Sequence, residues 1–167
     1  MISIRRYLAS TKSRTLVDPM LFVDDIYRYA LAKTVSREDA EDIAIEVAQQ
    51  APDKSDATEM RMYMIGMARR KIADHFRKKS SKAHSHPGTF QSSSTTIDQM
   101  IDVQRVLETV SDSHRECLIL KYVTGLTSEE IAKIMDTNSE AVDSLLQRAR
   151  KSFAIEWENM HGEPDAR

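Results

Sequence analysis

The sequence predicts an all-α protein made of two small helical domains, and three features of its 167 residues support this. Glycine and proline are scarce, with four of each, so few positions would interrupt a helix. Apolar residues recur at helical spacing in both halves of the chain. Between the halves, residues 79–97 are rich in Ser, Thr and Lys around a Pro-Gly pair, which indicates a flexible linker.

These patterns divide the chain into five segments. A basic N-terminal arm (1–17) is followed by a three- or four-helix bundle (18–79), a linker (80–97), a second helical domain (98–161) and a tail (162–167). No apolar run approaches the roughly 18 residues that a membrane span requires, so we expect no membrane insertion. The flexible linker leaves open whether the two domains are separated or packed together.

In the first domain, Pro19 suits a first helical turn, and Phe22 to Val35 follow one helical face. Ser36 is placed to cap the next helix, whose other face is strongly acidic. A break at Pro52 precedes a third helix. We expect a core from two stripes: Ala40, Ile43, Ala44 and Val47, and then Met60, Met64, Met67, Ala68, Ile72 and Phe76.

In the second domain, Ser111 is expected to cap one helix, and Gly125 provides a turn after it. Thr127 and Glu130 have the spacing of a capping box. Residues 136–139 then form a polar turn in which Asn138 or Ser139 caps a second helix, with an apolar face at Val142, Leu145, Leu146, Ala149 and Phe153. Two short helices joined by a tight turn predict a helix-turn-helix, with an ordinary helical hairpin as the alternative.

Charge is segregated along the chain. Residues 18–59 carry 11 acidic and 4 basic side chains, whereas residues 60–82 carry 8 basic side chains and one acidic. Such alternation indicates one surface for a polyanion and another for a basic protein partner. In the basic segment, Tyr63 is the better candidate to stack on an unpaired base, and Phe76 is expected in the core.

No pattern of catalytic residues is present. The sequence has no glycine-rich phosphate loop, zinc-ligand cluster or nucleophile motif. Asp74 and His75 are adjacent on a helix, so their side chains diverge by about 100°. His84 and His86 lack neighbours at ligand spacing, and we expect neither a metal nor a cofactor. We therefore predict that the protein is not an enzyme.

Cys117 is the only cysteine, which excludes an intrachain disulfide and favours a reducing, cytoplasmic location. It lies among Leu118, Ile119 and Leu120, where a small buried hydrophobe is expected.

The acidic helix, the basic helix and the helix-turn-helix together resemble one family. Residues 36–47 (SREDAEDIAIEV) are similar to the polymerase-binding helix of bacterial extracytoplasmic-function sigma factors, which keep only regions 2 and 4. Residues 60–79 (MRMYMIGMARRKIADHFRKK) are similar to the helix that melts the promoter and reads its −10 element. Residues 113–153 resemble region 4, which reads the −35 element.

The resemblance implies three sets of site residues. The core polymerase would bind Asp39, Asp42, Ile45 and Glu46. The −10 element would contact Tyr63, Arg69, Arg70, Lys71, His75, Arg77 and Lys78. The −35 element would contact Thr127, Ser139, Glu140, Asp143, Ser144, Gln147, Arg148 and Lys151.

The chain also departs from the family pattern. Tyr63, Ile45 and Arg70 stand where tryptophan, glutamine and asparagine are usual in region 2. In region 4, Asp143 and Leu145 replace a usual lysine and arginine, and Asp136 replaces the usual turn glycine. Carboxylates at the start of a recognition helix repel phosphate, although they accept hydrogen bonds from cytosine.

The main prediction is an alternative sigma factor that binds core RNA polymerase and promoter DNA and is controlled by an anti-sigma factor or another regulatory protein. The alternative is a sigma-like regulator or mimic that binds polymerase, an anti-sigma factor or an activator with little DNA reading. A stand-alone helix-turn-helix repressor is the third hypothesis, but it leaves the acidic and basic helices unexplained.

Overall fold

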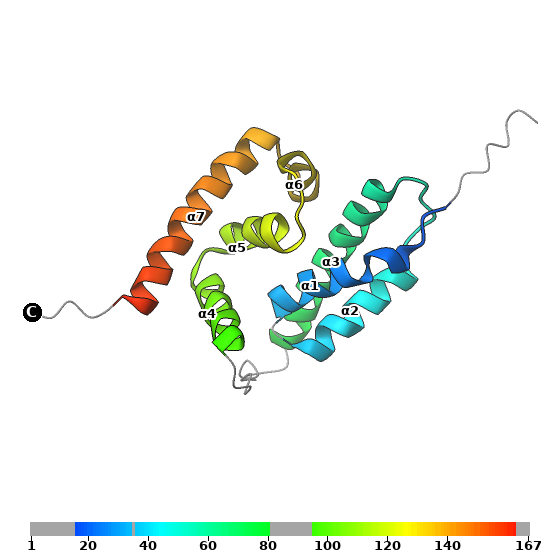
Figure 1. The fold of residues 1–167 in the computed structure, drawn as a ribbon. Helices are drawn as coiled ribbons and strands as arrows, with labels where there is room; N and C mark the ends of the chain where they lie inside the picture. The colour runs from blue at the N-terminus through cyan, green and yellow to red at the C-terminus, as the bar shows by residue number, and fades with distance from the viewer. Residues whose placement is uncertain (1–15, 35, 81–94, 163–167) are drawn as a thin grey trace, which may run out of the picture.

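The computed structural model of the protein describes residues 16–34, 36–80 and 95–162, and their helices form two bundles (Figure 1). These residues contain helices and no strand, which confirms the predicted all-α fold. Nearly all of the predicted N-terminal arm, most of the predicted linker with His84 and His86, and the end of the tail lie outside the described residues.

The N-terminal bundle consists of η2 (Pro19–Phe22), α1 (Val23–Thr34), α2 (Arg37–Gln49) and α3 (Ala57–Ser80). Ser36 caps α2 as predicted, because its Oγ accepts the Asp39 backbone N–H at 3.2 Å. The three α-helices bury Ile26, Tyr29, Ala30, Ala40, Ile43, Ala44, Val47, Met60, Met64, Ile65, Ala68 and Ile72. The methionines at helical spacing are thus core residues.

Phe76 does not belong to this core, and that expectation was wrong. Its side chain is 45% exposed and contacts the His75 ring edge-on, with the ring centroids 5.9 Å apart. His75 is paired with Asp39 in the first turn of α2. Phe76 therefore lies level with the end of the bundle, where α2 no longer offers a surface that could cover it.

The C-terminal bundle consists of α4 (Thr95–Thr109), α5 (Asp112–Leu118), η3 (Ile119–Val123, one turn of π-helix), α6 (Ser128–Met135) and α7 (Ser139–His161). The long helix α7 packs against α4, α5 and α6. Ser111 and Asn138 cap α5 and α7 as predicted, with Asn138 accepting the Ala141 N–H at 2.8 Å.

The turns on either side of α6 have the predicted chemistry. Gly125 has a φ of 67° and Asp136 a φ of 55°, the left-handed conformation that glycine and, less readily, aspartate adopt. Thr127 Oγ1 accepts the Glu130 N–H at 3.3 Å, and Glu130 Oε2 accepts the Thr127 N–H at 2.8 Å. This reciprocal capping box starts α6, so the helix-turn-helix geometry is set by local sequence.

The two bundles are packed together, which settles the arrangement that the sequence left open. Figure 1 shows α6 beside α3 and α5 facing α1. One continuous apolar cluster joins residues of the N-terminal bundle to Cys117, Ile119, Leu120, Leu126 and Ile131 of the C-terminal bundle. We call the contact of α1 and α3 with α5, η3 and α6 the bundle interface.

Cys117 is fully buried in that cluster, as predicted. Burial, with a smaller contribution from the charge of Glu116, raises the pKa of the Cys117 thiol to about 11. None of the helices in the described ranges is long and apolar enough to span a bilayer.

Candidate nucleic-acid interface

Helix α3 carries the predicted −10 residues, and two of its side chains are engaged by acidic residues of α2. Lys71 Nζ lies 2.6 Å from Glu46 Oε1, and His75 Nε2 lies 3.2 Å from Asp39 Oδ2. The hydrogen bond from Lys71 lowers the pKa of Glu46. Two residues predicted to contact DNA are therefore paired with two predicted to bind polymerase.

The other predicted polymerase-binding residues face solvent. Asp42 is exposed and makes no ion pair within the described part of the chain. Ile45 is 51% exposed, an apolar side chain in the middle of an acidic helix face. Such a residue resembles the apolar anchors at the centre of protein–protein interfaces.

The other predicted −10 residues of α3 differ in how accessible they are to a ligand. Arg77 bonds to Asp74 one turn earlier in the helix. Arg70 is exposed and forms no ion pair within the described residues. Lys78 is exposed as well, and Tyr63 is 40% exposed with Lys54 Nζ 5.5 Å from its ring centroid. Arg70 and Tyr63 are accordingly open to a ligand from solvent.

Arg69 is directed to the C-terminal bundle. Its Nη1 donates to the Ile134 carbonyl of α6 at 3.1 Å, and its Nε lies 3.6 Å from Glu116 Oε1. A side chain predicted to contact the −10 element thus contributes to the bundle interface.

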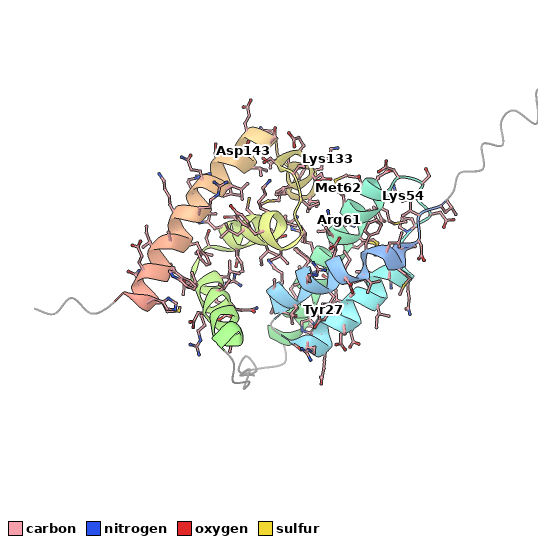
Figure 2. All side chains as sticks on the ribbon, in the orientation of Figure 1. Tyr27, Lys54, Arg61, Met62, Lys133 and Asp143 are labelled. Carbon is pink, nitrogen blue, oxygen red and sulfur yellow. The ribbon has the colours of Figure 1, made fainter. Side chains whose placement is uncertain are left out.

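The predicted −35 residues lie on α6 and α7. Thr127 uses its hydroxyl in the capping box, and Ser139 is half-buried. Asp143 Oδ1 accepts the Ser128 hydroxyl at 2.6 Å, which fixes this carboxylate at the start of α7 beside exposed Glu140. Asp143 is labelled in Figure 2. The remaining predicted residues are exposed along α7: Ser144, Gln147, Arg148 and Lys151.

Residues that sequence reasoning missed hold the bundle interface together. Glu116 of α5 is buried and accepts hydrogen bonds from Tyr29 Oη at 2.6 Å and Lys33 Nζ at 2.5 Å, both from α1. Burial, followed by the charge of Glu116, raises the pKa of Tyr29 well above its usual range. The sequence held one signal for this contact: Tyr29 and Lys33 are four residues apart, so both lie on one face of α1 and can bind the same partner.

A second such residue is Arg61 of α3. Its Nε donates to Asp25 Oδ2 at 2.7 Å, and its guanidinium also donates to the carbonyl of Thr124, just after η3. Arg61 is labelled in Figure 2 at the boundary of the two bundles. The described residues contain no group of three or more potential metal ligands.

Comparisons with known proteins agree with these features. Residues 100–153 match the family model for sigma-70, region 4. The chain is 25% identical over 150 residues to the ECF RNA polymerase sigma factor BldN of Streptomyces coelicolor, covering 80% of this chain and 56% of that protein. It is also 25% identical over 142 residues to SigM of Bacillus subtilis, covering 78% of this chain and 87% of that protein.

Among solved structures, the chain is similar to the sigma factor RpoE of Bartonella quintana, described in complex with the anti-sigma factor NepR. The TM-score is 0.62 at 18% identity, with 83% of this chain and 93% of that chain covered. This likeness supports the fold, whereas the family model and the two curated relatives support the ancestry. Residues 100–153 thus match sigma-70, region 4, and the chain as a whole is similar to extracytoplasmic-function sigma factors.

Proposed function

We propose that the protein is an alternative sigma factor that binds core RNA polymerase and directs promoter-specific initiation of transcription. Residues 18–79 would recognise and melt the −10 element, and residues 98–161 would read the −35 element. The single observation that carries this proposal is an acidic α2 lying antiparallel to a basic α3, followed by a sigma-70 region 4 helix-turn-helix. The protein would have no catalytic role and would act in the cytoplasm, with its polymerase.

The exposed face of α2 is the proposed polymerase-binding surface. Ile45 would supply the apolar anchor, and Asp42 would pair with basic residues of the polymerase. Glu46 would reach the polymerase only if it exchanged its 2.6 Å pair with Lys71 for a new partner. Charges at the rim of an interface set the association rate and the orientation more than the affinity.

The exposed residues of α3 are the proposed −10 surface. Arg70 and Lys78 would contact phosphates, and Tyr63 would stack on a base taken out of the duplex. If Lys71 is also to contact DNA, binding of Glu46 by polymerase would release it. Polymerase binding and −10 recognition would then be coupled through one ion pair.

A regulatory protein partner is part of the proposal. The RpoE relative in fold was solved with an anti-sigma factor. We extend this to the present chain as a partner that covers α2, α3 or α7 and so keeps the protein from polymerase or promoter.

The decisive experiment is transcription reconstituted with core polymerase from the organism that encodes this protein, with start sites mapped across its genome. Defined start sites that share −35 and −10 elements are expected. The substitution Ile45→Ala should weaken retention of core polymerase, whereas Ile155→Ala, which truncates a similarly exposed isoleucine of α7, should not. Retention of polymerase without initiation at any promoter of that genome would contradict the proposal.

A second candidate function is a sigma-like regulator that binds polymerase or a regulatory protein with little DNA reading. The two carboxylates at the start of α7, Glu140 and the Ser128-held Asp143, favour it. Under this function, replacing both with alanine would leave DNA binding unchanged. A stand-alone repressor is distinguished by a pull-down, because it would not retain core polymerase.

A further inference from the structure

A cavity of about 280 Å³ lies between α3 and α6, and both bundles contribute to its walls. The α3 side includes Met62, Tyr63 and Arg70, and the α6 side includes Lys133 and Ile134. Figure 2 labels Met62, Lys133 and, on the loop before α3, Lys54 around this region. Its volume is near the lower end of the range for small-molecule sites.

The charged groups that line the cavity are mostly cationic. They comprise four basic side chains and one carboxylate, Glu59, which pairs with Lys54 at 2.7 Å. Arg69 is engaged by Glu116 and by the Ile134 carbonyl. Arg70 and Lys133 are exposed and form no ion pair within the described residues, so two like charges from different bundles line one cavity. An anion between them would remove their repulsion.

The cavity also offers an aromatic surface and free space. The Tyr63 ring is 40% exposed in the cavity wall. Gly66 lies one turn further along α3, and a Cβ placed on it would meet no atom within 4 Å. A planar ring resting on Tyr63 would therefore pass over Gly66 without meeting a side chain.

We propose that this cavity binds a phosphorylated nucleoside, with Arg70 and Lys133 holding the phosphate from the two bundles and Tyr63 stacking on the base. The carbonyl groups at the end of α6 disfavour an anion, but the Arg69 hydrogen bond to Ile134 offsets this. The proposal concerns the free protein and does not depend on its role in transcription.

Binding at this cavity would stabilise the bundle interface, because the site is complete only while α3 and α6 are together. A ligand that binds only one arrangement stabilises it, and the stabilisation grows with the logarithm of the ligand concentration once this exceeds the Kd. The nucleotide would accordingly favour the packed form of the protein over a form with separated bundles.

The test is isothermal titration of the full chain with four probes: adenosine monophosphate, adenosine, inorganic phosphate and a short single-stranded DNA. We expect binding of the monophosphate and much weaker binding of adenosine or phosphate alone, since each lacks half of the contacts. Binding of single-stranded DNA without binding of the monophosphate at roughly 1 mM, where only about 4 kcal/mol is available, would overturn the proposal. If inorganic phosphate bound as tightly as adenosine monophosphate, the proposed stacking of the base on Tyr63 would be overturned.

Two variants locate the site. Lys133→Ala should lower the affinity for the monophosphate about tenfold, the loss expected for one charge-assisted hydrogen bond. The control Arg28→Ala removes an exposed cation of α1 and should leave that affinity unchanged. Gly66→Leu should abolish binding by filling the cavity, and its better helix propensity favours α3. Unchanged affinity in both Lys133→Ala and Gly66→Leu would place any binding elsewhere and overturn the proposal.

Discussion

Helices α3 and α7 are the two long helices proposed to contact DNA, yet they use their charges in opposite ways. On α3 the cations Lys71 and Arg77 each pair with an acidic residue of the same chain, and the His75 ring contacts Asp39. On α7 the cations Arg148, Arg150 and Lys151 are exposed and form no ion pair within the described residues, but two carboxylates precede them. A count of basic residues along the sequence therefore overestimates the charge that α3 offers to DNA.

The difference follows from where each helix packs. Helix α3 lies against the acidic α2 and, through Arg69, against Glu116 of the other bundle. Helix α7 packs on α4, α5 and α6 mainly through apolar residues, which leaves Arg148, Arg150 and Lys151 without an ion pair within the described residues. The availability of a cation depends on the neighbouring element as much as on its own helix.

The largest effect is expected from Glu116→Ala, which tests whether α3 depends on the bundle interface. It leaves Tyr29 and Lys33 without their partner in a largely buried site, at a cost of about 3 kcal/mol in the free energy of unfolding. Urea unfolding measures this. Glu108→Ala removes an exposed carboxylate of α4 and should change stability little; an equal loss in both variants would contradict the assigned role.

Alkaline pH should weaken the same interface. The pKa of Tyr29 and that of Cys117 are both raised in the folded protein, so both groups ionise more readily when unfolded. The folded state is stabilised because it keeps both groups neutral, and this contribution to the free energy of unfolding is complete below pH 9. It is lost as the pH rises through about 11 for Cys117, and the ionisation of Tyr29 adds to the loss above pH 10. Thermal unfolding from pH 8 to 11 tests this.

The double variant Tyr29→Phe/Cys117→Ala should flatten that alkaline slope. If the slope persisted unchanged, groups outside the bundle interface would be its cause.

The availability of cations on α3 is tested by comparing Arg70→Ala with Lys71→Ala. Removing a phosphate contact should lower the slope of log affinity against log salt by roughly one unit. Arg70 has no ion-pair partner in the part of the chain that the structure describes, whereas Lys71 must first leave Glu46, so the larger change is expected for Arg70. Promoter-DNA binding by the polymerase complex across a salt series measures both. Equal slopes of log affinity against log salt for the two variants would show that polymerase binding separates Lys71 from Glu46.

The smallest effect is expected at the start of α7. Replacing Glu140 and Asp143 with Gln and Asn removes two charges but keeps the side-chain shapes, including an acceptor for Ser128. If α7 enters the groove, affinity should rise about fivefold, corresponding to roughly 1 kcal/mol of relieved repulsion. Electrophoretic mobility shift with −35 DNA measures this. No change would favour the regulator function.

Local chemistry explains what could be predicted from the sequence. The caps at Ser36, Ser111 and Asn138, and the capping box at Thr127, depend on residues within one turn of each other. The buried stripes of α2 and α3 follow from helical periodicity up to the end of the bundle, where Phe76 is exposed.

Contacts between distant segments could not be predicted in this way. Glu116 and Tyr29 are 87 positions apart, and nothing near Glu116 in the sequence marks it as buried. The pairing of α2 with α3 was equally hidden, because periodicity gives the faces of a helix but not which neighbour each face meets. Whether the predicted site residues contact polymerase and DNA remains a proposal that the experiments above test.

The burial of Cys117 gives the protein a built-in reporter. With a thiol pKa of about 11, almost none of it is thiolate at neutral pH, and the packed bundles keep alkylating reagents away. Cys117 is the only cysteine in the chain, so its modification rate measures a single event, the opening of the cluster around α5. Pulse alkylation with mass spectrometry would thus time the separation of the two bundles when polymerase, promoter or a regulatory partner is added.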